Sequence, residues 1–141
     1  MKSPIELYLS KEITSKNKIP FSEFMDIALF HKEYGYYTNK SQIFGSEGDF
    51  ITSPITSSLF GESISNEFIN LNSAEQPMSI LELGGGDASL AISLIKNLAK
   101  IKSLPEKYII LEISNNLIEV QKRKIKEEVP ELYGLFSWVD N

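Results

Sequence analysis

The stretch that most constrains the fold is Ser79–Ser93, which contains three consecutive glycines, Gly84–Gly86. The largely apolar residues 79–83 predict a buried strand just before the glycines. A helical pattern follows, for which Asp87 is the expected N-cap. The core-facing positions of this helix would be Leu90, Leu94 and Leu98. A glycine turn between a strand and a helix leaves backbone N–H groups free and lets a ligand approach the main chain closely.

Two glycine-rich patterns could describe this turn. The dinucleotide fingerprint Gly-x-Gly-x-x-Gly needs a third glycine where this chain has Ser89. The S-adenosylmethionine (SAM) pattern, acidic-apolar-Gly-x-Gly-x-Gly, matches Glu82 and Gly84–Gly86 but has Ala88 at its last glycine. Alanine is the smallest replacement for glycine, so the residues favour SAM over a dinucleotide. A tight strand-to-helix turn that binds nothing is the alternative.

A second acidic residue lies at the end of the second predicted strand, a position that can bind a nucleoside. Residues 108–112 form a β-branched run that ends in Glu112. An acidic side chain at the end of a second parallel strand can accept hydrogen bonds from both ribose hydroxyls, which SAM and NAD share. We therefore expect Glu112 to bind a ribose, with a solvated strand-end carboxylate as the alternative.

The order of elements predicts an α/β fold. A helix over about 116–128 and a third strand over 135–139 complete a strand-helix-strand-helix-strand run, which implies a parallel sheet of Rossmann-like type. Parallel strands need cover on both faces, and this chain offers only part of that cover. We expect a helical N-terminal segment with a cleft-lining loop over 1–76 and the first half of a SAM-binding domain over 77–141.

The N-terminal segment is expected to hold short amphipathic helices. One spans 4–15, a second ends near His31, and a third begins at Thr52 or Ser53 with Pro54. The residues expected to be buried by the third helix are Phe60, Ile64, Phe68 and Leu71.

Composition narrows the classes of function. A formal charge of −5 argues against nonspecific nucleic-acid binding, and the basic run 122–126 is followed by acids, which suggests a solvated helix face. The chain has no cysteine and one histidine, His31, so we expect no metal site. No apolar run is long enough to span a bilayer and no signal peptide is recognisable, so a cytoplasmic protein without membrane contact is expected.

Two N-terminal motifs carry a resemblance to a known family. Residues 21–37, which include Phe-His-Lys-Glu-Tyr-Gly-Tyr-Tyr, resemble the opening signature of the MidA-like SAM-dependent methyltransferases. Residues 48–54 and 59–62 resemble the second signature of that family. The glycine turn, the strand ending in Leu-Glu-Ile-Ser, and Trp138 then fall in the family's order. The resemblance therefore extends over nearly the whole chain.

The resemblance implies a partial class I methyltransferase with SAM as cofactor. Glu82, Gly84–Gly86 and Glu112 would bind the cofactor, and Asp49 and Thr52 could line the cleft near the methyl group as catalytic candidates. For Asp49, a turn-stabilising role is the alternative. The substrate implied is a protein side chain, an arginine of a respiratory complex I subunit, because the family includes a complex I assembly factor that methylates arginine.

This sequence departs from the family pattern at three positions. Ala88 replaces a glycine, Asp87 could repel the carboxylate of SAM, and Ile55 replaces an acidic residue. Family members also continue far beyond the third strand, so a companion chain could supply the missing half. We therefore expect weak or no cofactor binding by these 141 residues alone. A catalytically inactive remnant or a noncatalytic binding module is the alternative, and an NAD-binding domain is disfavoured by Ser89.

Overall fold

The computed structural model describes residues 2–39, 43–45, 47–71 and 77–140. Its contacts group the chain into two compact units, Met1–Ser41 and Gln42–Asn141. Helix α5 (Leu59–Leu71), which the sequence analysis assigns to the N-terminal segment, packs on α6 (Ser89–Lys100) within the second unit.

The first unit contains helices α1 (Pro4–Lys16), α2 (Phe21–Phe30) and α3 (Tyr36–Asn39). Helix α1 begins with a capping box in which Ser3 and Glu6 satisfy each other's backbone amides. As predicted, His31 lies at the end of α2. Its ring stacks on Tyr34 with centroids 5.0 Å apart, and its Nδ1 accepts a hydrogen bond from the Tyr34 amide at 3.2 Å.

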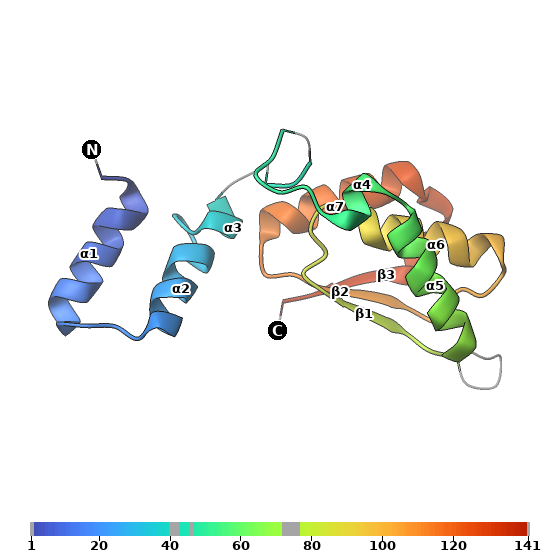
Figure 1. The fold of residues 1–141 in the computed structure, drawn as a ribbon, viewed down its shortest axis with the longest axis horizontal. Helices are drawn as coiled ribbons and strands as arrows, with labels where there is room; N and C mark the ends of the chain where they lie inside the picture. Colours follow the sequence, from blue (N-terminus) through green and yellow to red (C-terminus); the bar gives the residue numbers. More distant parts are fainter. Residues whose placement is uncertain (1, 40–42, 46, 72–76, 141) are drawn as a thin grey trace. The chain divides into compact units, whose positions relative to one another are not determined.

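The second unit is built on a three-stranded parallel sheet in the order β1-β2-β3 (Figure 1). The strands are β1 (Ile80–Leu83), β2 (Tyr108–Leu111) and β3 (Phe136–Val139). Leu83 pairs with Leu111, which pairs with Val139, so the three strands end at one edge. The predicted α/β fold, a partial Rossmann-like parallel sheet, is confirmed.

Helices connect and precede these strands. Between the strands run α6 and then α7 (Asn115–Glu128), while the short α4 (Ser53–Thr56) precedes α5. A 3-10 helix, η1 (Pro130–Leu135), leads into β3 and was not expected from the sequence. Helices α6 and α7 lie on the same side of the sheet (Figure 1).

The core lies between the sheet and these two helices. Tyr108 and Ile110 of β2 are buried with residues of both helices, Leu94, Ile95 and Leu98 of α6 and Ile125 of α7. Alternate strand residues supply this core, as the two-residue period of a strand requires.

The predicted buried face of α5 is largely wrong. The helix buries Gly61, Ser65 and Phe68, whereas Phe60 is 44% and Leu71 is 60% exposed. A Cβ on Gly61 would overlap the Ser93 hydroxyl and lie 3.0 Å from the Leu94 backbone nitrogen. Small residues let the α5 and α6 backbones approach closely, so the helix turns its small face, not its most apolar one, toward α6.

Within the described residues of the second unit, the opposite face of the sheet has no covering helix. Leu81 is 57% and Leu83 is 72% exposed, and Val139 is 38% exposed. These residues alternate with the core residues along their strands, which places them on the side away from α6 and α7. Within the second unit, α6 and α7 therefore cover one face of the parallel sheet, and the expectation that this chain offers only partial cover stays a prediction.

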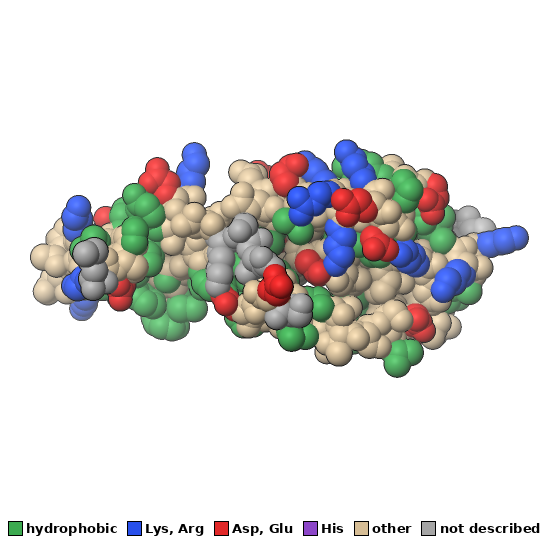
Figure 2. Space-filling model, turned by 90° about the horizontal axis from the view of Figure 1, so that it is seen from above, with side chains coloured by type: hydrophobic (Ala, Val, Ile, Leu, Met, Phe, Trp, Pro, Cys, Tyr) green, Lys and Arg blue, Asp and Glu red, His purple; other side chains and the backbone are tan. Residues whose placement is uncertain are grey.

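The helical side carries mixed charge. On the face seen in Figure 2, lysines and carboxylates are interspersed over the second unit. Exposed ion pairs between neighbouring helices account for part of this pattern, such as Lys96 of α6 with Glu128 of α7 at 2.5 Å. Of the helices described, none combines the length and the hydropathy that a bilayer crossing needs.

Replacing Gly61 tests the close contact between α5 and α6. Gly61→Val should lower the free energy of unfolding by about 1–3 kcal/mol, because the added carbons meet Ser93 and the Leu94 backbone. Gly134→Val is the matched control, since nothing lies within 4 Å of a Cβ at that position. Urea unfolding followed by circular dichroism measures both, and equal effects would contradict the packing described.

Candidate functional site

The glycine bend after β1 depends on left-handed backbone. Gly84 has φ +72°, Gly86 has φ +53°, and Ala88 has φ +65°. Ala88 is the N-cap of α6, so the prediction that Asp87 caps this helix is wrong by one position. The conformation of Ala88 is one that glycine adopts without cost, which explains physically why the SAM pattern has a glycine there.

Several amide groups of the bend have no acceptor. The Gly84 amide donates to Leu111 O at 2.9 Å, and the Ala88 amide donates to Gly85 O at 2.8 Å. Within the described part of the chain, the N–H groups of Gly85, Gly86 and Asp87 make no hydrogen bond. Successive unpaired amides in a turn form a concave donor surface that suits a negatively charged or polar ligand group.

A cavity of about 400 Å³ opens at this bend. Of the predicted site residues, Thr52, Glu82 and Gly84–Gly86 line it. Asp49 and Glu112 do not belong to its lining. The remaining lining residues are Phe44, Pro54, Leu83, Asp87 and Leu90. The structure therefore joins the second N-terminal motif to the glycine bend, although the two lie far apart in the sequence.

Glu82 is an unusual carboxyl group in this cavity. It accepts a hydrogen bond from the Tyr108 hydroxyl at 2.9 Å. Burial raises the pKa of Glu82 to about 7, against a usual value of 4.5, and the negative charges of Asp87 and Glu112 add to the rise. Near neutral pH this group therefore exists in both protonation states.

Glu112 lies immediately after β2 and is only 6% exposed. Its Oε1 accepts the Ser114 amide at 3.0 Å, and its Oε2 accepts the Gln121 side-chain amide at 3.2 Å. A carboxylate has about four acceptor positions, so these two donors do not use its full acceptor capacity. Its orientation is fixed by two protein donors.

The negative charge of Asp87 is paired with the positive charge of a lysine on α7. Lys124 Nζ lies 2.6 Å from Asp87 Oδ2 and 2.8 Å from Ser89 Oγ. Burial alone would raise the pKa of Asp87, but hydrogen bonds from Lys124 and Ser89 outweigh it and hold that pKa below its usual value. The negative charge that could repel an anionic ligand is thus paired locally.

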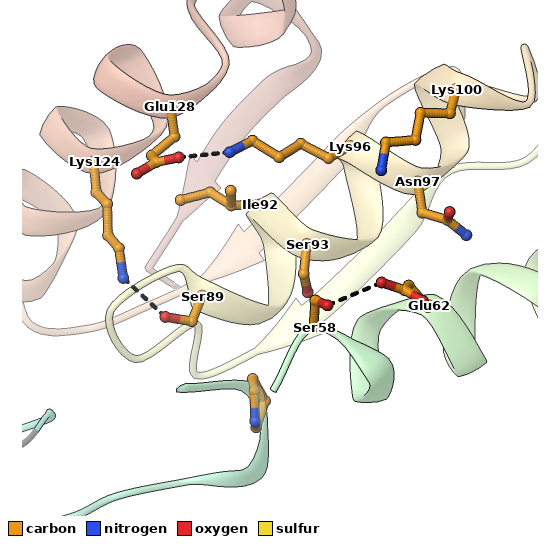
Figure 3. Close-up of a pocket in the computed structure, with 11 residues that line it drawn as sticks. Ser58, Glu62, Ser89, Ile92, Ser93, Lys96, Asn97, Lys100, Lys124 and Glu128 are labelled. Atoms are coloured by element: carbon orange, nitrogen blue, oxygen red, sulfur yellow. Dashed lines mark hydrogen bonds and ion pairs between the residues drawn. The ribbon is translucent and has the colours of Figure 1, made fainter. Parts of the chain in front are cut away.

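Lys124 also borders a second hollow, of about 280 Å³, along the outer side of α6 (Figure 3). In this view Lys124 points to Ser89, Lys96 to Glu128, and Ser58 to Glu62. Lys124, which the sequence analysis places on a solvated helix face, is partly exposed and also paired with Asp87. None of the predicted site residues lines this hollow.

Sequence reasoning missed Gln121. Its side chain is completely buried and contacts the glycine bend, Glu112 and β3. A signal was available, because Leu117, Gln121 and Ile125 recur every four residues on the buried face of α7. A polar residue on an apolar face needs buried hydrogen-bond partners. Across the described ranges, no group of three or more potential metal ligands occurs.

The raised pKa of Glu82 predicts a pH dependence of stability. Between pH 4.5 and about 7 the folded chain keeps this proton and the unfolded chain loses it, so stability should fall by roughly 2–3 kcal/mol as pH rises. Glu82→Gln should unfold with a free energy that exceeds the parent's increasingly from pH 5 to pH 8. Urea titrations at several pH values, with exposed Glu106→Gln as control, measure it. A constant difference between Glu82→Gln and the parent would contradict the burial described.

Comparison with known proteins identifies relatives by sequence. The family described as "Putative S-adenosyl-L-methionine-dependent methyltransferase" matches residues 59–141. A mitochondrial protein arginine methyltransferase NDUFAF7 homolog of Drosophila melanogaster is 40% identical over 98 residues, which cover 67% of this chain and 22% of that protein. The Bos taurus NDUFAF7 protein is 33% identical over 136 residues, 89% of this chain and 30% of its own length.

A solved structure agrees with these sequence matches. A Burkholderia thailandensis protein, crystallised with S-adenosyl-homocysteine, matches 100% of this chain with a TM-score of 0.88 and 27% identity. The chain covers 40% of that protein, so it spans well under half the length of each of these three relatives. The family match, the sequence relatives and the fold agree. This chain belongs to the family of S-adenosyl-L-methionine-dependent methyltransferases related to NDUFAF7.

Proposed function

We propose that this chain forms the cofactor-binding part of a SAM-dependent methyltransferase that acts on protein. The observation that carries the proposal is the bend at Gly84–Gly86, whose unpaired amides adjoin a cavity of about 400 Å³. The solved relative with the same fold binds S-adenosyl-homocysteine, the product that SAM leaves after methyl transfer.

Each predicted site residue has a proposed role. When bound, SAM supplies a sulfonium methyl group that a nucleophile attacks in line, so the protein's task is orientation. The backbone of Gly84–Gly86 would pass beneath the cofactor, and Glu112 would accept the ribose hydroxyls. Glu82 would orient the methionine end, and its raised pKa lets it donate or accept there. Thr52 lines the same cavity, which supports its place near the acceptor.

Asp49 has weaker support as a catalytic residue. It lies in the motif that leads to Thr52 but outside the cavity lining. We keep it as a candidate for the acceptor side of the site, where a carboxylate could orient a cationic guanidinium group. This role rests on the family resemblance and on the chemistry of the side chain.

We propose arginine as the methyl acceptor. The Drosophila and bovine relatives are both named protein arginine methyltransferases. A respiratory complex I subunit is the substrate that the family resemblance suggests. Those relatives are also named mitochondrial, whereas our expectation of a cytoplasmic protein stays a prediction.

We also propose that further family sequence covers the open face of the sheet. Leu81 and Leu83 are more than half exposed on β1, an edge strand among those described. Parallel sheets are stable when both faces are covered. The cover would be a parallel strand beside β1 with helices over Leu81 and Leu83, supplied by the same polypeptide or by a companion chain. A site completed in this way would bind cofactor more tightly than these residues alone.

Calorimetric titration with S-adenosyl-homocysteine tests the function. We expect weak or no binding by the 141-residue chain. A version continued with the downstream region of the Burkholderia relative should bind S-adenosyl-homocysteine and not NADH. Preference for NADH, or a folded continued chain that binds neither ligand, would contradict the proposal.

The role of Glu112 can be tested separately in the continued chain. Ligand at about 100 times its dissociation constant should raise the free energy of unfolding by roughly 2.7 kcal/mol. Glu112→Ala should lose most of that increase, because the ribose loses its acceptor. Glu127→Ala, which removes an exposed carboxylate of α7, should keep it. A full ligand-induced increase in Glu112→Ala would remove Glu112 from the site.

A further inference from the structure

Gln121 is a fully buried polar side chain on α7. Its amide nitrogen donates to Gly86 O at 3.0 Å and to Glu112 Oε2 at 3.2 Å. Its amide oxygen accepts the indole N–H of Trp138 at 2.8 Å. These partners determine the amide orientation, because an indole N–H can only donate, whereas a carbonyl and a carboxylate can only accept.

The three partners lie in or shortly after three different strands. Gly86 belongs to the bend after β1, Glu112 follows β2, and Trp138 lies in β3. Gln121 therefore connects, through hydrogen bonds, all three chain segments at the edge where the parallel strands end. Among the described residues, no other hydrogen bond joins the Gly86 carbonyl to a side chain.

Gln121 also packs against the backbone of the bend at Gly85. A Cβ on Gly85 would lie 3.2 Å from Gln121 Nε2 and 2.7 Å from Ile110 Cγ2. The bend therefore packs closely against both Ile110 and the Gln121 amide. The unpaired amides of the bend lie immediately around the carbonyl that Gln121 holds.

We propose that Gln121 is a positioning residue for the cofactor site, an inference that rests on the proposed function. By holding Gly86 O, it sets the path of the bend and hence the directions of the unpaired amides at Gly85 to Asp87. By donating a hydrogen bond to Oε2 of Glu112, Gln121 fixes the plane of that carboxylate and keeps Oε2 in the role of hydrogen-bond acceptor. A fixed acceptor and fixed donors bind a nucleoside without the cost of ordering them.

The sharpest variant is Gln121→Glu in the chain continued with the Burkholderia region. A protonated glutamic acid can still donate to one of the two acceptors and accept from Trp138, so at pH 5.5 it should keep part of the parent's affinity for S-adenosyl-homocysteine. An ionised one cannot donate and faces the carboxylate of Glu112. The affinity should therefore fall by about tenfold or more between pH 5.5 and pH 8.5, beyond any change in the parent.

Two further variants separate positioning from stability. Asn97→Asp makes the same amide-to-carboxyl change on α6, where the side chain lines the hollow of Figure 3 and donates to Ser65. It should show the parent's pH profile of affinity. Gln121→Met fills the space without donors and should weaken binding at every pH, with circular dichroism used to confirm that it folds.

The possible results distinguish a failure of the proposed function from a failure of the role proposed for Gln121. If the parent does not bind S-adenosyl-homocysteine, the proposed function and this inference both fail. If the parent binds but Gln121→Glu follows its pH profile, or folded Gln121→Met binds equally well, then Gln121 only fills the core and the inference alone is overturned.

Discussion

The site depends on one constraint, which is that parallel strands end together at a single edge of the sheet. Leu83, Leu111 and Val139 are in register there, so the glycine bend and Glu112 lie at the same edge of the sheet although many residues separate them in sequence. The bend can follow its path because Gly84 and Gly86 have positive φ. Backbone amides and a carboxylate are thereby placed at one edge of the sheet, which is where α/β folds bind nucleosides.

The surroundings of the three acidic side chains at this edge reduce the repulsion that they would exert on an anionic ligand. Asp87 is paired with Lys124, Glu82 keeps its proton up to about pH 7, and Glu112 is held by an amide on each side. Three acidic groups can therefore stand close together in a partly buried site. This arrangement offers both donors and acceptors, which suits a zwitterionic methionine end and a ribose.

The sequence predicted the elements with strong local signals. Strand ends, the glycine bend and α7 follow from periodicity and turn chemistry, and the order of elements predicted a parallel sheet. Features that depend on long-range packing were not predictable. The close contact of Gly61 with Ser93 decides which face of α5 is buried. The path of the bend decides which residue is the N-cap of α6, and the approach of α7 to Asp87 decides the partner of Lys124. Gln121 had a local signal, but its partners are visible only in three dimensions.

We propose that S-adenosyl-homocysteine binds at the bend after β1. Amide NMR spectra of the continued chain, recorded during titration with this ligand, test it most directly. We expect the amide signals of Gly85, Gly86 and Asp87 to shift most, while the signals of amides beside the hollow of Figure 3, such as that of Lys100, do not shift. Saturable binding with the largest shifts along that hollow, and none at the bend, would contradict it.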